Sequence, residues 1–141
     1  KMMKYVLFAC LFAVSQAQLT RKAMDCICQV ESNCNENVGC VPDPVTLSCG
    51  AYQIKEAYWI DCGRPGGSWQ ACAATISCSE TCVNAYMARY GTYCTGGRTP
   101  NDQDYARIHN GGPTGCTSTG TLGYWDKVRA CCDSGSGSCN Y

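Results

Sequence analysis

The spacing of apolar residues along the chain predicts several short helices. The clearest spans residues 79–90, where the apolar side chains fall on one helical face and Gly91 is expected to end the helix. Another helix is expected to begin after Ser68, a suitable N-cap, and to continue to Ile76. Helical segments are also predicted at residues 25–31, with Asp25 as N-cap and Glu31 in the last turn, and at 56–62, 102–109 and 122–129.

The segment from Asp43 to Lys55 has a different pattern, which predicts a β-hairpin. An alternating run follows Asp43, residues 48–50 (Ser-Cys-Gly) give a turn signal, and residues 51–54 are expected to form the second strand. Several short helices beside one small antiparallel sheet make the expected fold class α+β. A chain of 141 residues with 45% hydrophobic content is large enough for one domain with a modest core.

The first 17 residues are typical of a secretory signal peptide. A basic start (residues 1–4) precedes an apolar stretch (5–14) and a cleavage site of small residues ending at Ala17. Residues 18–141 are then the expected single mature domain, secreted and extracellular, with a Ser/Gly-rich tail from about residue 133. No later segment is apolar for long enough to span a membrane, so no membrane association is expected.

The cysteine content indicates a disulfide scaffold made in an oxidising compartment. The chain has fifteen cysteines, and cleavage after Ala17 would remove Cys10 and leave fourteen, enough for seven bridges whose pairing stays open. One of these bridges is expected to fasten the tail through Cys139. A zinc site is disfavoured, because the chain has one histidine and a secretory context. No metal or organic cofactor is expected.

The balance of charges does not predict binding to a strongly charged partner through the overall field of the protein. The chain has eleven basic and eleven acidic residues, and loss of Lys1 and Lys4 would leave nine basic against eleven acidic, a net charge of −2. Such a domain has no field that would steer it to nucleic acid or to another polyanion. Nucleic acid is therefore not an expected partner, and binding must come from a groove.

Two acidic residues stand in contrasting positions. Glu31 is expected at a helix end, and Asp43 lies between Pro42 and Pro44 at the entrance to the hairpin. Most acidic side chains are simply exposed, so either residue alone carries little information. As a pair facing each other, however, they could flank a sugar–sugar bond. Glycoside hydrolysis requires one protonated carboxyl group for the leaving oxygen and one ionised carboxylate.

Five motifs together resemble the invertebrate-type (i-type, destabilase-like) lysozymes: CxCxxES, CxxD, LSCGxYQIKxxYWIDCG, CxxxCVxxYMxRYG and DYARIHNGGPxGC. The similarity runs from about Cys26 to Arg129. It implies a lysozyme-like fold and an antibacterial or digestive muramidase, which cleaves the β-1,4 bond between N-acetylmuramic acid and N-acetylglucosamine in bacterial peptidoglycan. By the same resemblance Glu31 is the proton donor and Asp43 the nucleophile of a retaining mechanism, in a monomer or weak homodimer.

The resemblance also implies which residues line the saccharide groove. They are Lys55, Tyr58, Trp59, Asp61, Tyr86, His109, Asn110 and Gly111. Aromatic residues at this density more often belong to a core, and Trp59 is the one most expected to be buried. His109 is assigned to binding and not to general-base catalysis.

Two other functions are compatible with these residues. Some relatives are isopeptidases that cut γ-glutamyl-lysine crosslinks, using a serine of the hairpin and a lysine corresponding to Lys55. Here Thr46 stands where relatives often have serine, although Ser48 remains, and a lysine beside Asp61 would be held charged. A catalytically weak peptidoglycan-binding defence protein is the second alternative.

Two positions depart from the cysteine pattern of the relatives. They often have cysteines where this chain has Ala23 and Asp102, so one bridge is expected to be lost. The tail has more cysteines than expected, so one bridge is expected to be gained.

Overall fold

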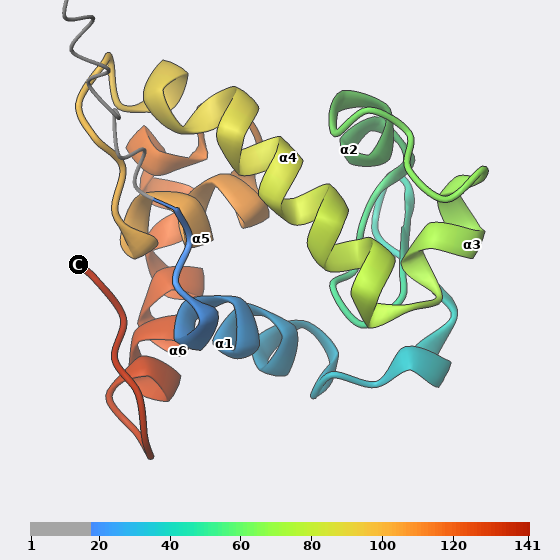
Figure 1. Ribbon diagram of the computed structural model, residues 1–141, viewed down its shortest axis with the longest axis horizontal. Helices are drawn as coiled ribbons and strands as arrows, with labels where there is room; N and C mark the ends of the chain where they lie inside the picture. The colour runs from blue at the N-terminus through green and yellow to red at the C-terminus, as the bar shows by residue number, and fades with distance from the viewer. Residues whose placement is uncertain (1–17) are drawn as a thin grey trace, which may run out of the picture.

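The computed structural model describes residues 18–141, so the predicted signal peptide lies outside the described residues (Figure 1). Six α-helices, three short 3₁₀ helices and one two-stranded antiparallel sheet make up this part, in the order α1 (Arg21–Ser32), η1 (Glu36–Val38), β1 (Cys40–Pro42), β2 (Leu47–Cys49), α2 (Glu56–Asp61), α3 (Trp69–Ala73), α4 (Ile76–Cys94), α5 (Asp102–Gly111), η2 (Gly115–Thr117), η3 (Thr119–Thr121) and α6 (Leu122–Cys132). The predicted α+β class is confirmed.

The long helix α4 runs across the molecule and divides it into two parts (Figure 1). Helices α1, α5 and α6 pack together beside one part of α4, and α2, α3 and the β-hairpin lie at its other end. The core contains fully buried aliphatic side chains from four helices, namely Ile27, Val83, Ile108 and Val128. No helix in the described part of the chain is long and apolar enough to cross a membrane.

Helix α1 begins earlier than the sequence predicted. Its N-cap is Thr20, whose hydroxyl accepts a hydrogen bond from the backbone N–H of Ala23, whereas Asp25 lies inside the helix and pairs with Arg21. The prediction of Asp25 as N-cap was therefore wrong, because both residue types can cap a helix and the local pattern does not choose between them. Glu31 does lie in the last turn, as predicted.

Helix α4 is longer at both ends than predicted. Thr75 caps its start, so Ile76 begins α4 and the helix after Ser68 ends at Ala73, earlier than predicted. At its other end α4 continues through Gly91 to Cys94. Gly91 is inside the helix because α5 and the loop before it pack closely there: a Cβ atom at this position would lie 2.9 Å from Pro100 and from Tyr105. This glycine serves close packing, and it does not stop the helix.

The hairpin turns at a different place from the one predicted. Asp43 donates its N–H to the carbonyl of Thr46 (2.7 Å), and Thr46 donates back to the carbonyl of Asp43 (3.2 Å), so residues 43–46 form the turn. The second strand is Leu47–Cys49, and residues 51–54 form a further turn held by a single bridge between Cys49 and Ile54. An aspartate followed by proline favours a turn, and this placement puts Asp43 at the hairpin tip.

Seven disulfides pair all fourteen cysteines of the described residues: Cys26–Cys131, Cys28–Cys34, Cys40–Cys49, Cys62–Cys82, Cys72–Cys78, Cys94–Cys116 and Cys132–Cys139. Complete pairing was predicted, and so was a bridge that fastens the tail through Cys139. Small secreted domains use such bridges because their cores are small.

A buried polar cluster stands where relatives were expected to have a disulfide. The Asp102 carboxylate is 1% exposed and accepts hydrogen bonds from the Thr20 backbone (3.0 Å), the Thr20 hydroxyl (2.7 Å) and the Asn140 backbone (2.7 Å). The Asp102 N–H in turn donates to the Asn140 carbonyl. This one carboxylate therefore fastens the start of α1 and the tail to the beginning of α5.

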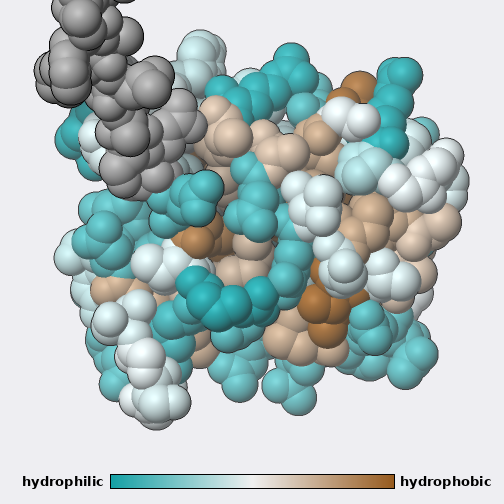
Figure 2. Space-filling model, in the orientation of Figure 1, coloured by the Kyte–Doolittle hydropathy of each residue, from teal (hydrophilic) through white to brown (hydrophobic). Residues whose placement is uncertain are grey.

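The surface carries its apolar side chains in small groups. On the face shown in Figure 2, hydrophobic residues are scattered among polar ones and form no single large patch. Among the exposed large hydrophobic residues, Val41, Val45 and Leu47 all belong to the hairpin region that also holds Asp43.

Candidate active site

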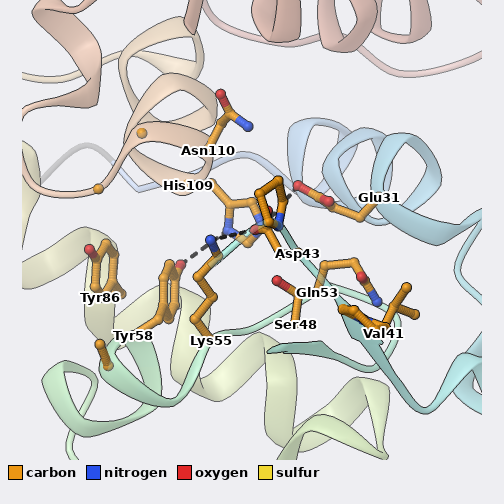
Figure 3. A pocket seen from close by; sticks show the side chains of 15 residues that line it. Glu31, Val41, Asp43, Ser48, Gln53, Lys55, Tyr58, Tyr86, His109 and Asn110 are labelled. Atoms are coloured by element: carbon orange, nitrogen blue, oxygen red, sulfur yellow. Dashed lines mark hydrogen bonds and ion pairs between the residues drawn. The ribbon is translucent and has the colours of Figure 1, made fainter. Parts of the chain in front are cut away.

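A cavity of about 550 Å³ lies between the helical part of the molecule and the hairpin. Its walls come from the end of α1, the hairpin, the segment leading into α2, one turn of α4 and the C-terminal end of α5. Glu31 and Asp43 both line it, and Figure 3 shows them entering from different elements, α1 and the hairpin tip. The fold thus brings the two predicted acids to one site.

Side chains of α6 and α5 contact the carboxyl group of Glu31. Its side chain is 18% exposed, and its Oε1 accepts a hydrogen bond of 2.8 Å from the hydroxyl of Tyr124 and lies 3.5 Å from Nε2 of His109. Burial, and next the charge of Glu31, raise the pKa of Tyr124 well above its usual value, so this phenol stays a hydrogen-bond donor. Because Tyr124 donates to Oε1, Oε2 is the oxygen on which a neutral Glu31 would carry its proton.

His109 is a buried, fully bonded group. Its Nε2 lies 3.0 Å from the backbone carbonyl of Tyr52, and its Nδ1 lies 3.2 Å from the hydroxyl of Tyr58. A carbonyl can only accept, so Nε2 carries the hydrogen and Nδ1 accepts from Tyr58. Both ring nitrogens thus have a hydrogen-bond partner, and Nε2 also lies 3.5 Å from Oε1 of Glu31.

Asp43 has a different environment from Glu31. Its side chain is 37% exposed at the hairpin tip, and its Oδ2 lies 2.5 Å from the ammonium group of Lys55. Solvent and an adjacent cation both favour the charged form of a carboxylate. The cavity therefore contains one sheltered carboxyl group with hydrogen-bond donors behind it, and one solvated carboxylate beside a cation.

Two stacked tyrosines form one wall of the cavity. The rings of Tyr58 (α2) and Tyr86 (α4) are nearly parallel, with centroids 3.6 Å apart and an interplanar angle of 9°. Asn110 and Gly111 line the cavity from the end of α5. An apolar ring surface beside a few fixed polar groups is the usual construction of a small-molecule site.

The predicted groove residues separate into two groups. Six of them line the cavity: Lys55, Tyr58, Tyr86, His109, Asn110 and Gly111. Trp59 and Asp61 are not part of this lining. The indole N–H of Trp59 donates to the Pro65 carbonyl at 2.8 Å, and Asp61 accepts from the hydroxyl of Tyr90 at 2.9 Å.

The sequence did not indicate every residue at the site. Gln53 also lines the cavity, as does Ser48, which the sequence indicated only for isopeptidase chemistry, and Tyr124 contacts Glu31 from 93 positions along the chain. The periodic apolar residues around Tyr124 predicted a helix, but no local signal assigns its hydroxyl to a carboxylate on α1. Only the packing of α6 against α1 makes this contact.

The profile of the Destabilase family matches residues 20–131, nearly the whole described domain. The chain belongs to the Destabilase family of invertebrate-type lysozymes. The predicted family is thereby confirmed, and with it the enzyme class.

Named relatives agree with this assignment. This lysozyme is 50% identical over 111 residues to the lysozyme of Meretrix lusoria, a match that covers 79% of this chain and 88% of that protein. It is 42% identical over 127 residues to invertebrate-type lysozyme 3 of Caenorhabditis elegans, covering 84% and 91%. The match to lysozyme 1 of Crassostrea virginica is 50% identical over 116 residues and spans 61% of that protein.

Solved structures support the lysozyme fold. The Tapes japonica lysozyme aligns with a TM-score of 0.73 at 46% identity, over 78% of this chain and 88% of that one. The Meretrix lusoria lysozyme, solved in complex with Aeromonas hydrophila PliI, aligns with a TM-score of 0.74 at 49% identity, over 79% and 89%. The lysozyme-like fold predicted from the motifs is confirmed.

The residues considered for isopeptidase chemistry lie at the hairpin and just after it, and two of them, Ser48 and Lys55, line the same cavity. Thr46 lies in the hairpin turn and Ser48 is a buried residue of β2. Lys55 was expected beside Asp61, but its ion pair is with Asp43.

Proposed function

We propose that this lysozyme hydrolyses the β-1,4 bond between N-acetylmuramic acid and N-acetylglucosamine in bacterial peptidoglycan, with Glu31 as acid and base and Asp43 as nucleophile. The observation that carries the proposal is the presence in one cavity of two carboxyl groups in opposite environments. Glycosidases need this contrast, because one group must deliver a proton while the other stays ionised.

In the first step the glycan strand occupies the cavity with the bond to be cleaved between the two acids. Glu31 transfers the proton on Oε2 to the glycosidic oxygen, and the bond from that oxygen to the anomeric carbon breaks. An Asp43 oxygen attacks the same carbon from the opposite face and forms a covalent glycosyl-enzyme ester. Lys55, 2.5 Å from Oδ2, fixes the orientation of the attacking carboxylate.

In the second step Glu31 acts as a base. Its carboxylate takes a proton from a water molecule, the water oxygen attacks the anomeric carbon, and Asp43 leaves as a carboxylate. The proton returns Glu31 to its starting state, and the configuration at the anomeric carbon is retained. Between the two steps Glu31 is an anion in a sheltered position, where the hydroxyl of Tyr124 donates a hydrogen bond to it.

The remaining cavity residues are assigned to the sugar rings. Tyr58 and Tyr86 offer an aromatic wall, and Asn110 with Gly111 offers polar groups at the end of α5. Trp59 supports the segment from outside the cavity. No metal or cofactor takes part in this proposal. Seven disulfides support secretion into an oxidising environment, where bacterial walls are accessible.

A turbidity assay with a suspension of bacterial walls tests the proposal. The native enzyme is expected to clear the suspension, and Glu31→Gln is expected to lose nearly all of this activity, because an amide has no proton to give. Glu56→Gln is the matched control, since Glu56 is an exposed glutamate outside the cavity lining, and it is expected to retain full activity.

Two results would contradict the proposal. A correctly folded Glu31→Gln enzyme that still clears the suspension would exclude Glu31 as the acid. A native protein that binds walls and never clears them would instead be the catalytically weak defence protein considered from the sequence.

A further inference from the structure

The aromatic wall of the cavity continues beyond it along α4. Tyr86 stacks on Tyr58 inside the cavity, Tyr90 follows with its ring centroid 4.8 Å from that of Tyr86, and Tyr93 follows 6.2 Å from Tyr90. Exposure rises along this row: Tyr86 is buried, Tyr90 is half-buried and Tyr93 is 65% exposed. The row therefore leads from the inside of the cavity to the open surface.

Helix geometry places these rings on one side of α4. Residues 86, 90 and 93 are separated by four and three positions, which is the spacing of neighbours on one helical face. At 1.5 Å per residue, Tyr93 lies about 10 Å further along the axis than Tyr86. A single exposed tyrosine needs no explanation, but an unbroken row that begins in the active-site wall extends that wall.

Charged groups flank the outer part of the row. Asp61 accepts a hydrogen bond of 2.9 Å from the hydroxyl of Tyr90, and Arg89 donates to the backbone carbonyl of Asp61 at 3.0 Å. The guanidinium carbon of Arg89 lies 5.2 Å from the centroid of the Tyr90 ring, and the Arg89 side chain is 55% exposed. Tyr90 is thus fixed in place, and a cation stands beside it at the surface.

We propose that Tyr90 and Tyr93, with Arg89 beside them, form an outer subsite for the glycan strand of peptidoglycan. Sugars that extend past the cavity would lie with their apolar faces on these rings, and Arg89 would pair with a carboxylate that the strand carries on its muramic acid units. The inference rests on the proposed function, because the occupant is the strand that continues from the cavity. The outer subsite would also place Asp61 next to the glycan strand, although Asp61 lies outside the cavity lining.

A comparison of long and short substrates tests the subsite. Initial rates would be measured on soluble polymeric peptidoglycan strands and on a short N-acetylglucosamine oligomer that fills only the cavity. For Tyr93→Ala, KM on the long strand is expected to rise about three- to tenfold, the value of one aromatic contact, with kcat unchanged and the short oligomer cleaved as before. Tyr93→Phe keeps the ring and is expected to restore the native KM.

A neighbouring exposed residue provides the matched control. Thr92→Ala changes α4 one position from Tyr93 at an exposed site, and its KM on the long strand is expected to equal that of the native enzyme. Arg89→Lys is expected to raise KM on peptidoglycan strands but not on chitin fragments of equal length, which carry no carboxylate, because the bidentate fork is lost.

The outcomes separate this proposal from the proposed function. A native enzyme that cleaves neither substrate would refute the function itself. A native enzyme that cleaves both, with equal KM on the long strand for Tyr93→Ala and the native chain, would refute the outer subsite alone. Loss of a dimer in Tyr93→Ala by sedimentation, with KM unchanged, would identify a second copy of the chain as the occupant and would also overturn the proposal.

Discussion

Replacement of Tyr124 by phenylalanine probes the proposed mechanism through a group that never touches the substrate. The change removes one hydroxyl group and with it the 2.8 Å hydrogen bond to Oε1 of Glu31, while the ring keeps its place in α6. This bond stabilises the ionised carboxylate more than the neutral acid, since hydrogen bonds to charged groups are the stronger ones. The variant should therefore form the Glu31 anion in the first step more slowly than the native enzyme does.

The size of the effect follows from the strengths of the two kinds of bond. A hydrogen bond to a charged group contributes about 1.5–3 kcal/mol and a neutral one about 0.5–1.5 kcal/mol. A difference of about 1.4 kcal/mol corresponds to a tenfold change in rate. Because Nε2 of His109 remains 3.5 Å from the same oxygen, the expected fall in kcat/KM is about three- to tenfold.

The assay is kcat/KM on soluble peptidoglycan strands at one fixed pH. The value is expected to be lower in Tyr124→Phe, because the first step generates the Glu31 anion and this anion has lost a donor. Burial and the charge of Glu31 hold the pKa of Tyr124 well above its usual value, so the phenol of the native enzyme is a hydrogen-bond donor.

A matched control separates this effect from a general change in stability. Tyr141 also donates its hydroxyl to a carboxylate, that of Asp133, but on the tail outside the cavity lining. Tyr141→Phe is expected to leave kcat/KM unchanged. If Tyr124→Phe also left kcat/KM unchanged, the assignment of Glu31 as the acid held by Tyr124 would be wrong.

Three further predictions concern other parts of the molecule. If Asp43 is the nucleophile, NMR should detect the β-anomer as the first product, and an initial α-anomer would contradict this role. A ligand-bound crystal structure should then place the carboxyl groups of Glu31 and Asp43 about 5–5.5 Å apart. Asp102→Ala should lower the free energy of unfolding by about 2–4 kcal/mol in urea titrations, since it leaves buried donors unpaired. The control Asp126→Ala, at an exposed position, should lower it by less than about 0.5 kcal/mol. Equal losses in the two variants would contradict a special role of the buried cluster. Turnover of a γ-glutamyl-lysine amide should be far slower than wall lysis and should stay so in Thr46→Ser; a fast native rate that disappears in Lys55→Ala would show isopeptidase catalysis.

Local sequence patterns were sufficient for much of the fold and for the identity of the two acids. Apolar spacing located α2, α3, α4, α5 and α6, and Ser68 was recognised as a cap, because a helix face and a cap depend on residues within a few positions of each other. The motifs around Glu31 and Asp43 identified the family, and an even cysteine count after Ala17 indicated complete pairing. None of these inferences required knowledge of distant contacts.

Tertiary packing decided the rest. Local signals could not choose between Thr20 and Asp25 as the cap of α1, and Thr20 lies beside the buried carboxylate of Asp102, 82 positions away. Gly91 could stop a helix or permit close packing, and only the approach of α5 selects the second role.

The chemistry of the cavity also depends on contacts that no local pattern encodes. Glu31 meets the hydroxyl of Tyr124 because α1 packs against α6, and Lys55 pairs with Asp43 because the hairpin turns at residues 43–46. A residue's type and its neighbours in sequence state which chemistry it can perform. Which proton it holds depends on the charges, donors and solvent around it, and these are set by side chains that only folding brings together.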